Sequence, residues 1–289
     1  MATPDYLEGA IDLHVHSAPD LDPRRFTDIE LATEAKKAGM GAILLKSHLG
    51  STVERAALVA SVVRGMDVFG GLTLNYSVGG LNPAAVDVAL RLGARQIWMP
   101  TRSAANHRRH EGMTGGICII DDAGNLIPAA REIVDTATAA NCPIGTGHLS
   151  PQEVFALAQY GDSCEIPPKF LLTHPEWHVT YYSVNAQRRL AEFGTFTFER
   201  CFVSTTHRCG FVPIAAIATA ISEVGIGTTI LSTDLGQPDT PPPVEGLRRY
   251  GAELRALGFS ASDLHRMMHI TPRAFLGELR GARVNSDRV

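Results

Sequence analysis

The sequence predicts an α/β protein of the (β/α)8 type, a TIM barrel with a small β-hairpin insertion. Eight short apolar segments alternate with segments of helical periodicity along the 289 residues, and such alternation is typical of parallel sheets. Eight strand–helix units in roughly 250 residues are the usual size of a closed barrel. No linker, charge run or low-complexity stretch divides the chain, so we expect residues 1–289 to form one domain.

The expected strands are short and apolar. The first begins at Ile11 and ends before Pro19, and the other seven lie at residues 42–45, 68–76, 96–100, 143–146, 169–174, 195–204 and 229–232. The expected helices lie at residues 28–37, 52–64, 83–92, 129–140, 151–160, 185–193 and 213–224, with two or three more towards the C-terminus. Thr27 and Ser150 are expected N-caps, because a hydroxyl can accept a hydrogen bond from the first helical turn.

One stretch interrupts the alternation. Residues 101–116 are basic and contain glycine, and two short apolar segments then flank the sequence Asp121-Asp122-Ala123-Gly124-Asn125. Apolar segments around a glycine-containing loop are typical of a β-hairpin. We therefore expect an insertion over about residues 112–128 that decorates the barrel.

The composition limits the class of partner. The net charge is −4, so the surface offers no general attraction to nucleic acid or to anionic lipid. No segment approaches the roughly 20 apolar residues of a membrane span, and the N-terminal residues lack a signal-peptide pattern, so we expect a cytoplasmic protein. The five cysteines form no C-x-x-C pair, which favours reduced thiols. We expect a small-molecule substrate and a homo-oligomer.

The first strand carries two histidines, His14 and His16. Side chains two residues apart on a strand point to the same face, so both imidazoles can reach one metal ion. An H-x-H triplet alone also suits two core histidines, one of them hydrogen-bonded to a backbone carbonyl. The later strand ends favour the metal.

In a (β/α)8 barrel the functional face lies at the carboxyl ends of the strands. The residues expected there include several histidines and one aspartate: His14, His16, Lys46, His48, Asn75, Arg102, His148, His174, residues 199–207 and Asp234. Four histidines and an aspartate at one rim are hard to explain as separate core residues. They predict a metal site.

This pattern resembles the amidohydrolase superfamily of metal-dependent hydrolases. The resemblance rests on H-x-H in the first strand, single histidines after the fifth and sixth, and aspartate after the eighth, and the C-terminal sequence His269–Gly277 is similar to the N-P-A-x-x-L-G ending of that superfamily. It implies that His14, His16 and Asp234 hold one divalent metal ion, with His148 and His174 holding a second ion or the substrate. Zinc suits these ligands, and manganese or iron also fit.

The sequence departs from the superfamily at the fourth strand, which offers neither the carboxylated lysine nor the glutamate that bridges two metals in many members. Lys46, one of four lysines, ends an apolar strand. It is a carboxylated bridge or a cationic substrate ligand, and we favour one metal ion with Lys46 as the substrate ligand, because an ammonium group repels metal cations.

The remaining roles follow from this arrangement. We assign catalytic roles to Asp234, as the acceptor of a proton from the attacking water, and to Lys46 and His207. Substrate binding is assigned to Lys46, His48, Arg102 and Glu199; His48 is alternatively a metal ligand or a proton shuttle. Arg24 and Arg25 join Arg102 as basic groups that suit an anionic substrate.

The expected reaction is hydrolysis of an amide-, lactone- or ester-like bond in a small anionic molecule. A phosphoesterase that opens with H-x-H is disfavoured, because Gly236 stands where its D-x-H motif needs histidine. A decarboxylase or hydratase of the same superfamily, or a barrel that binds metal without catalysis, remains an alternative.

Overall fold

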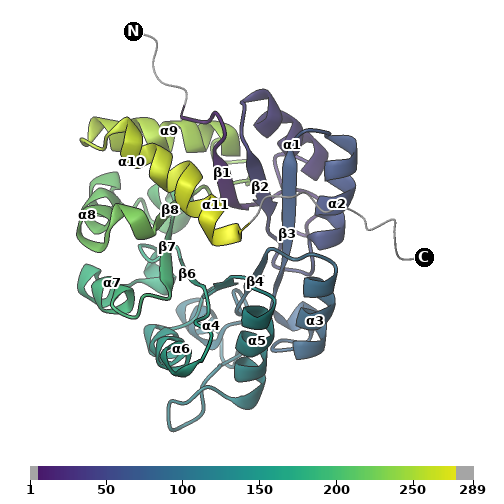
Figure 1. Cartoon of the computed structure of the whole chain (residues 1–289), viewed down its shortest axis with the longest axis vertical. Helices are drawn as coiled ribbons and strands as arrows, with labels where there is room; N and C mark the ends of the chain where they lie inside the picture. Colours follow the sequence, from purple (N-terminus) through teal and green to yellow (C-terminus); the bar gives the residue numbers. More distant parts are fainter. Residues whose placement is uncertain (1–5, 278–289) are drawn as a thin grey trace.

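The computed structural model describes residues 6–277, and its centre is one sheet of eight parallel strands. The strands are β1 (Ile11–Val15), β2 (Ala42–Leu45), β3 (Asp67–Thr73), β4 (Gln96–Trp98), β5 (Ile144–Gly145), β6 (Phe170–Thr173), β7 (Phe196–Cys201) and β8 (Thr229–Ser232). They pair in sequence order, and the helices surround them (Figure 1). This order places every strand beside the next one in the chain, as in a barrel built of successive βα units.

The sheet closes between β1 and β8. The backbone N–H of His16 donates to the carbonyl of Leu235 at 2.8 Å, and the N–H of Asp234 donates to the carbonyl of His14 at 2.7 Å. Val15 and Leu235 form a parallel bridge. The predicted (β/α)8 barrel is therefore confirmed. The one-domain prediction for residues 1–289 includes residues 1–5 and 278–289, which lie outside the described part, and it stays a prediction.

The helices cover the outside of the barrel. They are α1 (Asp28–Lys37), α2 (Val53–Val62), α3 (Pro83–Arg91), α4 (Ala105–His110), α5 (Pro128–Ala139), α6 (Pro151–Ser163), α7 (Val184–Ala191), α8 (Ile214–Val224), α9 (Pro243–Ala256), α10 (Ala261–His265) and α11 (Thr271–Leu276). A π-helical turn, Arg266–Ile270, joins the last two. Thr27 and Ser150 cap α1 and α6 with complete capping boxes, as predicted.

Apolar side chains fill the amino-terminal part of the barrel. Ile11, Leu44, Trp98 and Ile230 come from four different strands and pack in one buried cluster, which Phe275 of α11 joins. Helix α11 lies across this end of the barrel (Figure 1). The interior is thus closed at one end, and the opening lies at the carboxyl ends of the strands.

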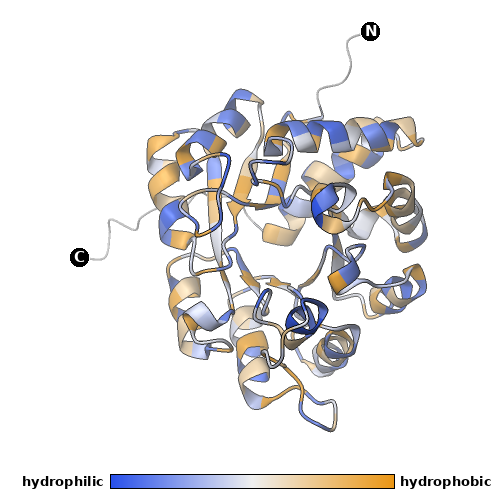
Figure 2. Ribbon diagram, turned by 180° about the vertical axis from the view of Figure 1, so that it is seen from behind, coloured by the Kyte–Doolittle hydropathy of each residue, from blue (hydrophilic) through white to orange (hydrophobic). Residues whose placement is uncertain are grey.

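The insertion differs in detail from its prediction. The predicted hairpin is reduced to a single antiparallel bridge, between Ile120 and Leu126. A separate parallel bridge joins Ile117 to Ala104, just before α4. The basic residues before the insertion form the short helix α4. The sequence did not predict this helix, because it has no apolar periodicity. Helix α4 is strongly hydrophilic and lies near the centre of the opposite view (Figure 2). In the described residues, no helix is long and apolar enough to cross a membrane.

Candidate metal centre

An irregularity in β1 places the two histidines. Between Asp12 and Val15 the pairing with β2 shifts by one residue, which is the signature of a β-bulge. Leu13 packs in the barrel interior, and His14 also points inward, to within 6.1 Å of the Trp98 ring, measured between ring centroids. The bulge therefore turns His14 towards the interior although it directly follows an inward-facing residue.

Three ligand atoms meet where β1 and β8 join, and we call His14, His16 and Asp234 the β1–β8 site. Oδ1 of Asp234 lies 3.0 Å from Nε2 of His14 and 3.0 Å from Nε2 of His16. The three atoms lie within 4.8 Å of one another, close enough for one metal ion. The backbone bonds that close the barrel link the same residues, so barrel closure itself assembles the cluster.

The backbone at Asp234 and Gly236 is unusual. Asp234 has φ +51°, a left-handed conformation that an aspartate adopts at some cost. Gly236 has φ +138°, and a Cβ atom there would lie 2.0 Å from the carbonyl oxygen of His16. No side chain fits at position 236. The histidine of a D-x-H motif is therefore sterically excluded by the same close contact that seals the barrel.

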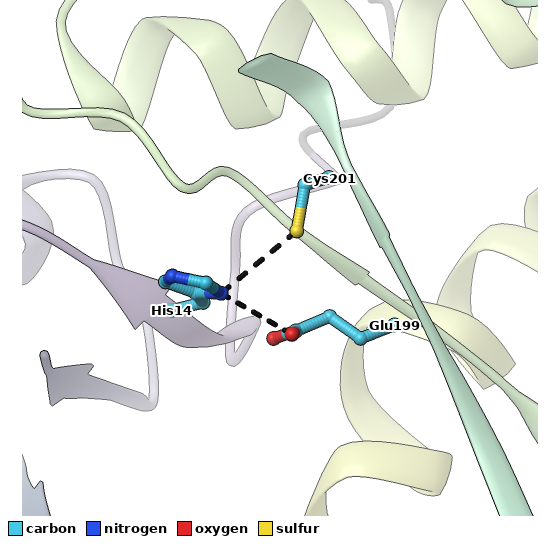
Figure 3. A group of neighbouring side chains, drawn as sticks. All are labelled: His14, Glu199 and Cys201. Carbon is cyan, nitrogen blue, oxygen red and sulfur yellow. Dashed lines mark hydrogen bonds and ion pairs between the residues drawn. The ribbon is translucent and has the colours of Figure 1, made fainter. Parts of the chain in front are cut away.

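Glu199 lies behind His14 and not in the cavity. Its carboxylate is 3.2 Å from Nδ1 of His14, and both side chains are fully buried (Figure 3). Cys201 approaches the same nitrogen at 3.9 Å. The predicted substrate-binding role of Glu199 is not supported by this position, since a carboxylate on Nδ1 orients the imidazole and directs Nε2 towards a metal.

Lys46 is buried beside the β1–β8 site. Its Nζ lies 2.8 Å from Nε2 of His14 and 5.5 Å from the centroid of the Trp98 ring. Burial lowers the pKa of Lys46, although the carboxylates of Asp234 and Glu199 act in the opposite direction. Lys46 also lines the cavity. The side chain therefore stands between a metal ligand and the space open to a substrate.

The opposite side of the cavity is lined by aromatic rings. His107, His148, His174 and Trp177 form what we call the histidine wall, in which His148 and His174 each lie 5.1 Å from Trp177 between ring centroids. Nδ1 of His148 is 2.8 Å from Nδ1 of His107, and Nδ1 of His174 is 3.0 Å from the Thr180 hydroxyl. The two predicted ligands thus lie at one cavity, but outside the 4.8 Å cluster.

Burial sets the charge of most of these imidazoles. It lowers the pKa of His16 and His174 to about 3 and holds that of His148 and His48 well below the ordinary value. Neutral imidazoles have the lone pair that a metal requires. Burial opposes ionisation of Asp234, but His14 and His16 hold its pKa well below the usual range.

The cavity has a volume of about 590 Å³, enough for a small molecule. His16 and Asp234 of the β1–β8 site line it together with Lys46 and the histidine wall, whereas His14 lies just behind them, and three arginines line it as well: Arg24, Arg102 and Arg208. Each arginine is paired with an aspartate, Arg24 with Asp20 at 2.9 Å, Arg102 with Asp22 at 2.5 Å and Arg208 with Asp239 at 2.7 Å. The cavity is therefore polar and of mixed charge.

Two histidines lie where the sequence did not predict them. His207 lies at the surface, paired with Asp239 at 3.0 Å, and is not among the residues that line the cavity. His107 belongs to the basic stretch at residues 101–116, for which the sequence predicted no role in the metal site, yet it contacts His148 directly. A search for histidines in the loop after the fourth strand, where that loop meets the barrel rim, would have found it.

Comparison with known families identifies the chain. The model of a family of unknown function, DUF6282, matches residues 9–197. The chain belongs to this family. The matched part of the DUF6282 chain includes His14, His16 and the histidine wall, and it ends before Asp234. A sequence comparison with curated proteins gave no significant match.

Solved structures share the fold of the DUF6282 chain. An amidohydrolase from Pseudomonas aeruginosa has a TM-score of 0.65 at 13% identity and covers 95% of this chain and 97% of its own. A 2,6-dihydroxybenzoate decarboxylase from Rhizobium has a TM-score of 0.57 at 13% identity, covering 93% and 98%. A dipeptidase described as a metallo-peptidase has 0.57 at 12%, covering 93% and 98%. The predicted resemblance to the amidohydrolase superfamily is confirmed at the level of the fold.

The donor set of the β1–β8 site fits a divalent metal ion. Two imidazole nitrogens and one carboxylate oxygen are the ligand types of catalytic zinc sites, and the cavity leaves room for an open position. His14, Glu199 and Cys201 form a second possible cluster, on the Nδ1 side of His14. All three are buried and none of them lines the cavity, whereas His16 and Asp234 on the Nε2 side both do. The Nε2 side therefore fits a catalytic metal better.

Proposed function

We propose that this protein is a metal-dependent hydrolase of small anionic molecules. The observation that carries the proposal is the convergence of Nε2 of His14, Nε2 of His16 and Oδ1 of Asp234 beside a cavity of about 590 Å³. The bond cleaved is of the amide, lactone or ester type. His14, His16 and Asp234 would hold the ion, zinc being the first choice and manganese or iron the next.

A divalent ion bound there supplies a Lewis acid and lowers the pKa of a water molecule towards neutrality. The residues of the chain provide the rest. Asp234 has a pKa well below the usual range and faces the cavity, so its carboxylate would accept a proton from a water molecule that attacks a substrate carbonyl. Glu199 keeps Nε2 of His14 directed at the ion through its contact with Nδ1.

Lys46 orients the substrate in this proposal. Lys46 lines the cavity and contacts Nε2 of His14, and if that nitrogen held the ion, the ammonium would be available to a substrate carboxylate instead. Arg102 assists from the rim. Binding energy from the charged end of the substrate then positions its carbonyl over the ion. His148 and His174 line the same cavity and contact the substrate, or hold a second ion.

The main competing reaction is decarboxylation. A 2,6-dihydroxybenzoate decarboxylase shares the fold, and the cationic groups of the cavity suit a carboxylate that is to be lost as well as one that is only bound. The two reactions differ in product, since only decarboxylation releases carbon dioxide. We further propose a cytoplasmic location, which cell fractionation would test, and a homo-oligomer, whose mass size-exclusion chromatography with light scattering would measure.

The decisive experiment combines metal analysis with a substrate screen. Protein purified without chelator is analysed for zinc, manganese and iron, and is then assayed on lactones, cyclic amides and small aromatic carboxylic acids, with carbon dioxide release measured in parallel. We expect about one ion per chain and hydrolysis that a chelator abolishes. Absence of metal after reconstitution, or turnover that chelation leaves unchanged, would refute the proposal.

Lys46→Met separates the roles of the lysine, because methionine keeps the length and removes the charge. If Lys46 is a substrate ligand, the variant keeps its metal and loses apparent affinity or rate. Loss of the metal would show a carboxylated bridge instead. A variant unchanged in both would remove Lys46 from the mechanism.

A further inference from the structure

His48 follows β2 and lies between the β1–β8 site and the histidine wall. Its ring stacks on His16 with 5.0 Å between centroids and lies 6.1 Å from the ring of His148. It lines the cavity and is half-buried. Nδ1 is 2.9 Å from the Thr101 hydroxyl, whereas no hydrogen bond among the described residues occupies Nε2. The position of the ring proton determines what His48 can do. A bare Nε2 can bind a metal ion, whereas a protonated Nε2 can only donate a hydrogen bond.

The hydrogen bonds of Asn75 determine which end of its side-chain amide is the oxygen and which is the NH₂ group. Its side-chain oxygen accepts from the backbone N–H groups of Thr101, at 2.9 Å, and Ser103, at 3.1 Å. The opposite end of the amide must therefore be the NH₂ group, since backbone N–H groups only donate. That NH₂ donates to the backbone carbonyl of His48 at 3.0 Å and to the Thr101 hydroxyl oxygen at 2.7 Å. Every hydrogen-bonding position of the amide is used.

The direction of the hydrogen bond between the Thr101 hydroxyl and His48 follows from the bond to Asn75. Its oxygen already accepts from Asn75, and its single proton needs an acceptor because the side chain is fully buried. In the described structure, Nδ1 of His48 is the other side-chain atom bonded to that hydroxyl. The hydroxyl therefore donates to Nδ1. A neutral imidazole that accepts at Nδ1 carries its proton on Nε2.

We propose that His48 donates a hydrogen bond from Nε2 to the electronegative atom of the bound substrate, and that Asn75 and Thr101 are the positioning residues that fix this tautomer. The role rests on the proposed function, because it assumes that the substrate occupies the same cavity. A protonated Nε2 has no lone pair for a metal, so His48 is not a ligand. Pre-organised donors of this kind stabilise the negative charge that develops on a carbonyl oxygen during hydrolysis.

The tautomer is tested by NMR on protein labelled with ¹⁵N at histidine. Long-range proton–nitrogen correlation spectra distinguish the protonated ring nitrogen from the bare one, and the His48 signals are assigned by their absence in His48→Asn. We expect Nε2 protonated and Nδ1 bare in the wild type and in Thr101→Ser, which keeps the hydroxyl. Thr101→Val removes the hydroxyl, so a mixture of tautomers is expected there. A protonated Nδ1 in the wild type would overturn the proposal, whether or not any substrate is found.

Two further readouts on His48→Asn test the role. Zinc content after reconstitution should equal that of the wild type, and loss of zinc would show that His48 is a ligand. On the lactone or amide that the wild type hydrolyses fastest, kcat should fall by about 10²–10³-fold, the usual effect of removing one such donor. Thr101→Val should lower kcat in the same direction and Thr101→Ser should restore it. An unchanged kcat in His48→Asn would refute the donor role even where the tautomer is as proposed.

Discussion

The two sides of the cavity are built differently, although both present histidines to it. At the β1–β8 site, His14, His16 and Asp234 lie on or directly after strands that are hydrogen-bonded to each other, and their ligand atoms converge within 4.8 Å. In the histidine wall, His148 and His174 follow β5 and β6 and are bonded to residues outside the sheet, His107 of α4 and Thr180 of the turn after β6. The rings of His148 and His174 are as close as those of the β1–β8 site, 5.1 Å between centroids, but each Nδ1 is bonded to another partner and the two rings do not join a cluster of three ligand atoms.

His174 combines an unusual backbone conformation with a side-chain contact to the turn that follows it. It has φ +33°, and its Nδ1 is engaged by a hydroxyl from the same loop. Asp234 shares the positive φ, at +51°. Strained backbone of this kind persists where surrounding contacts over-determine it and is concentrated at functional sites. Both sides of the cavity therefore carry strain, but only the β1–β8 site uses it to gather three ligand atoms.

The first prediction separates the two sides by metal content. His14→Ala and His16→Ala each remove one of three converging ligands, so we expect metal content to fall from about one ion per chain to background. His148→Asn should keep about one ion, because His148 lies outside the cluster. Elemental analysis after reconstitution measures both.

His207→Ala is the matched control for this comparison, because that histidine lies at the rim and does not line the cavity. Circular dichroism and thermal melting check that all four variants are folded. The prediction would be wrong if folded His14→Ala and His16→Ala kept the ion, or if only His148→Asn lost it. Either result would assign the metal to the histidine wall.

The second prediction concerns the support of the histidine wall. Glu176, two residues after His174, forms a buried ion pair with Arg200 of β7. Glu176→Ala leaves the guanidinium buried without its charged partner, which typically costs about 3–5 kcal/mol. Denaturant unfolding measures the loss of stability.

Glu245→Ala is the control, because the Glu245–Arg248 pair of α9 is about half exposed on both sides. Its removal should change the free energy of unfolding by less than about 0.5 kcal/mol. Equal losses in the two variants would mean that the buried pair does not stabilise the loop of the histidine wall.

Much of this arrangement could be predicted from the sequence, because the fold depends on local patterns. The bounds of α1 and β8 were predicted to the residue, since a capping threonine starts the helix and a short apolar run forms the strand. The ends of β3 and β7 were placed too late, because both continue as apolar sequence after the barrel pairing stops. Helix α4 was missed because its six residues, Ala105 and five polar ones, show no amphipathic period.

The site was less predictable than the fold. Alternation correctly placed His14 and His16 on one face, but the bulge that lets Leu13 and His14 both face inward depends on pairing with β2 and leaves no mark in the sequence. The position of Glu199 behind His14 depends on the barrel being closed. The contact of His107 with His148 depends on how the loop after β4 folds back.

The third prediction tests which nitrogen of His14 faces the metal. Glu199 bonds to Nδ1, so Glu199→Gln should weaken zinc binding by about 10–100-fold, the usual effect of changing the group that orients a metal-bound histidine. Competition with a chelating dye measures the dissociation constant. Cys201→Ala should change it little, because 3.9 Å from Nδ1 is a weak contact. An equal loss in Cys201→Ala would place the ion among His14, Glu199 and Cys201 instead.

The last and smallest effect is expected at the rim, where Arg102 pairs with Asp22 across the cavity mouth. The two side chains are 50% and 40% exposed, and the hydrogen bond from Arg102 lowers the pKa of Asp22. Exposed pairs contribute little to stability, so Arg102→Gln and Asp22→Asn should each change it by at most about 1 kcal/mol.

The effects of these two variants on the binding of an anionic substrate should have opposite signs. Arg102→Gln removes the cation and should raise KM, whereas Asp22→Asn removes the internal competitor for that cation and should lower KM. Shifts of about two- to fivefold correspond to 0.5–1 kcal/mol. Added salt should shrink both shifts, because exposed charges are screened. If the two variants change KM in the same direction, Arg102 does not hold the substrate, and the anion is bound deeper in the cavity, at Lys46.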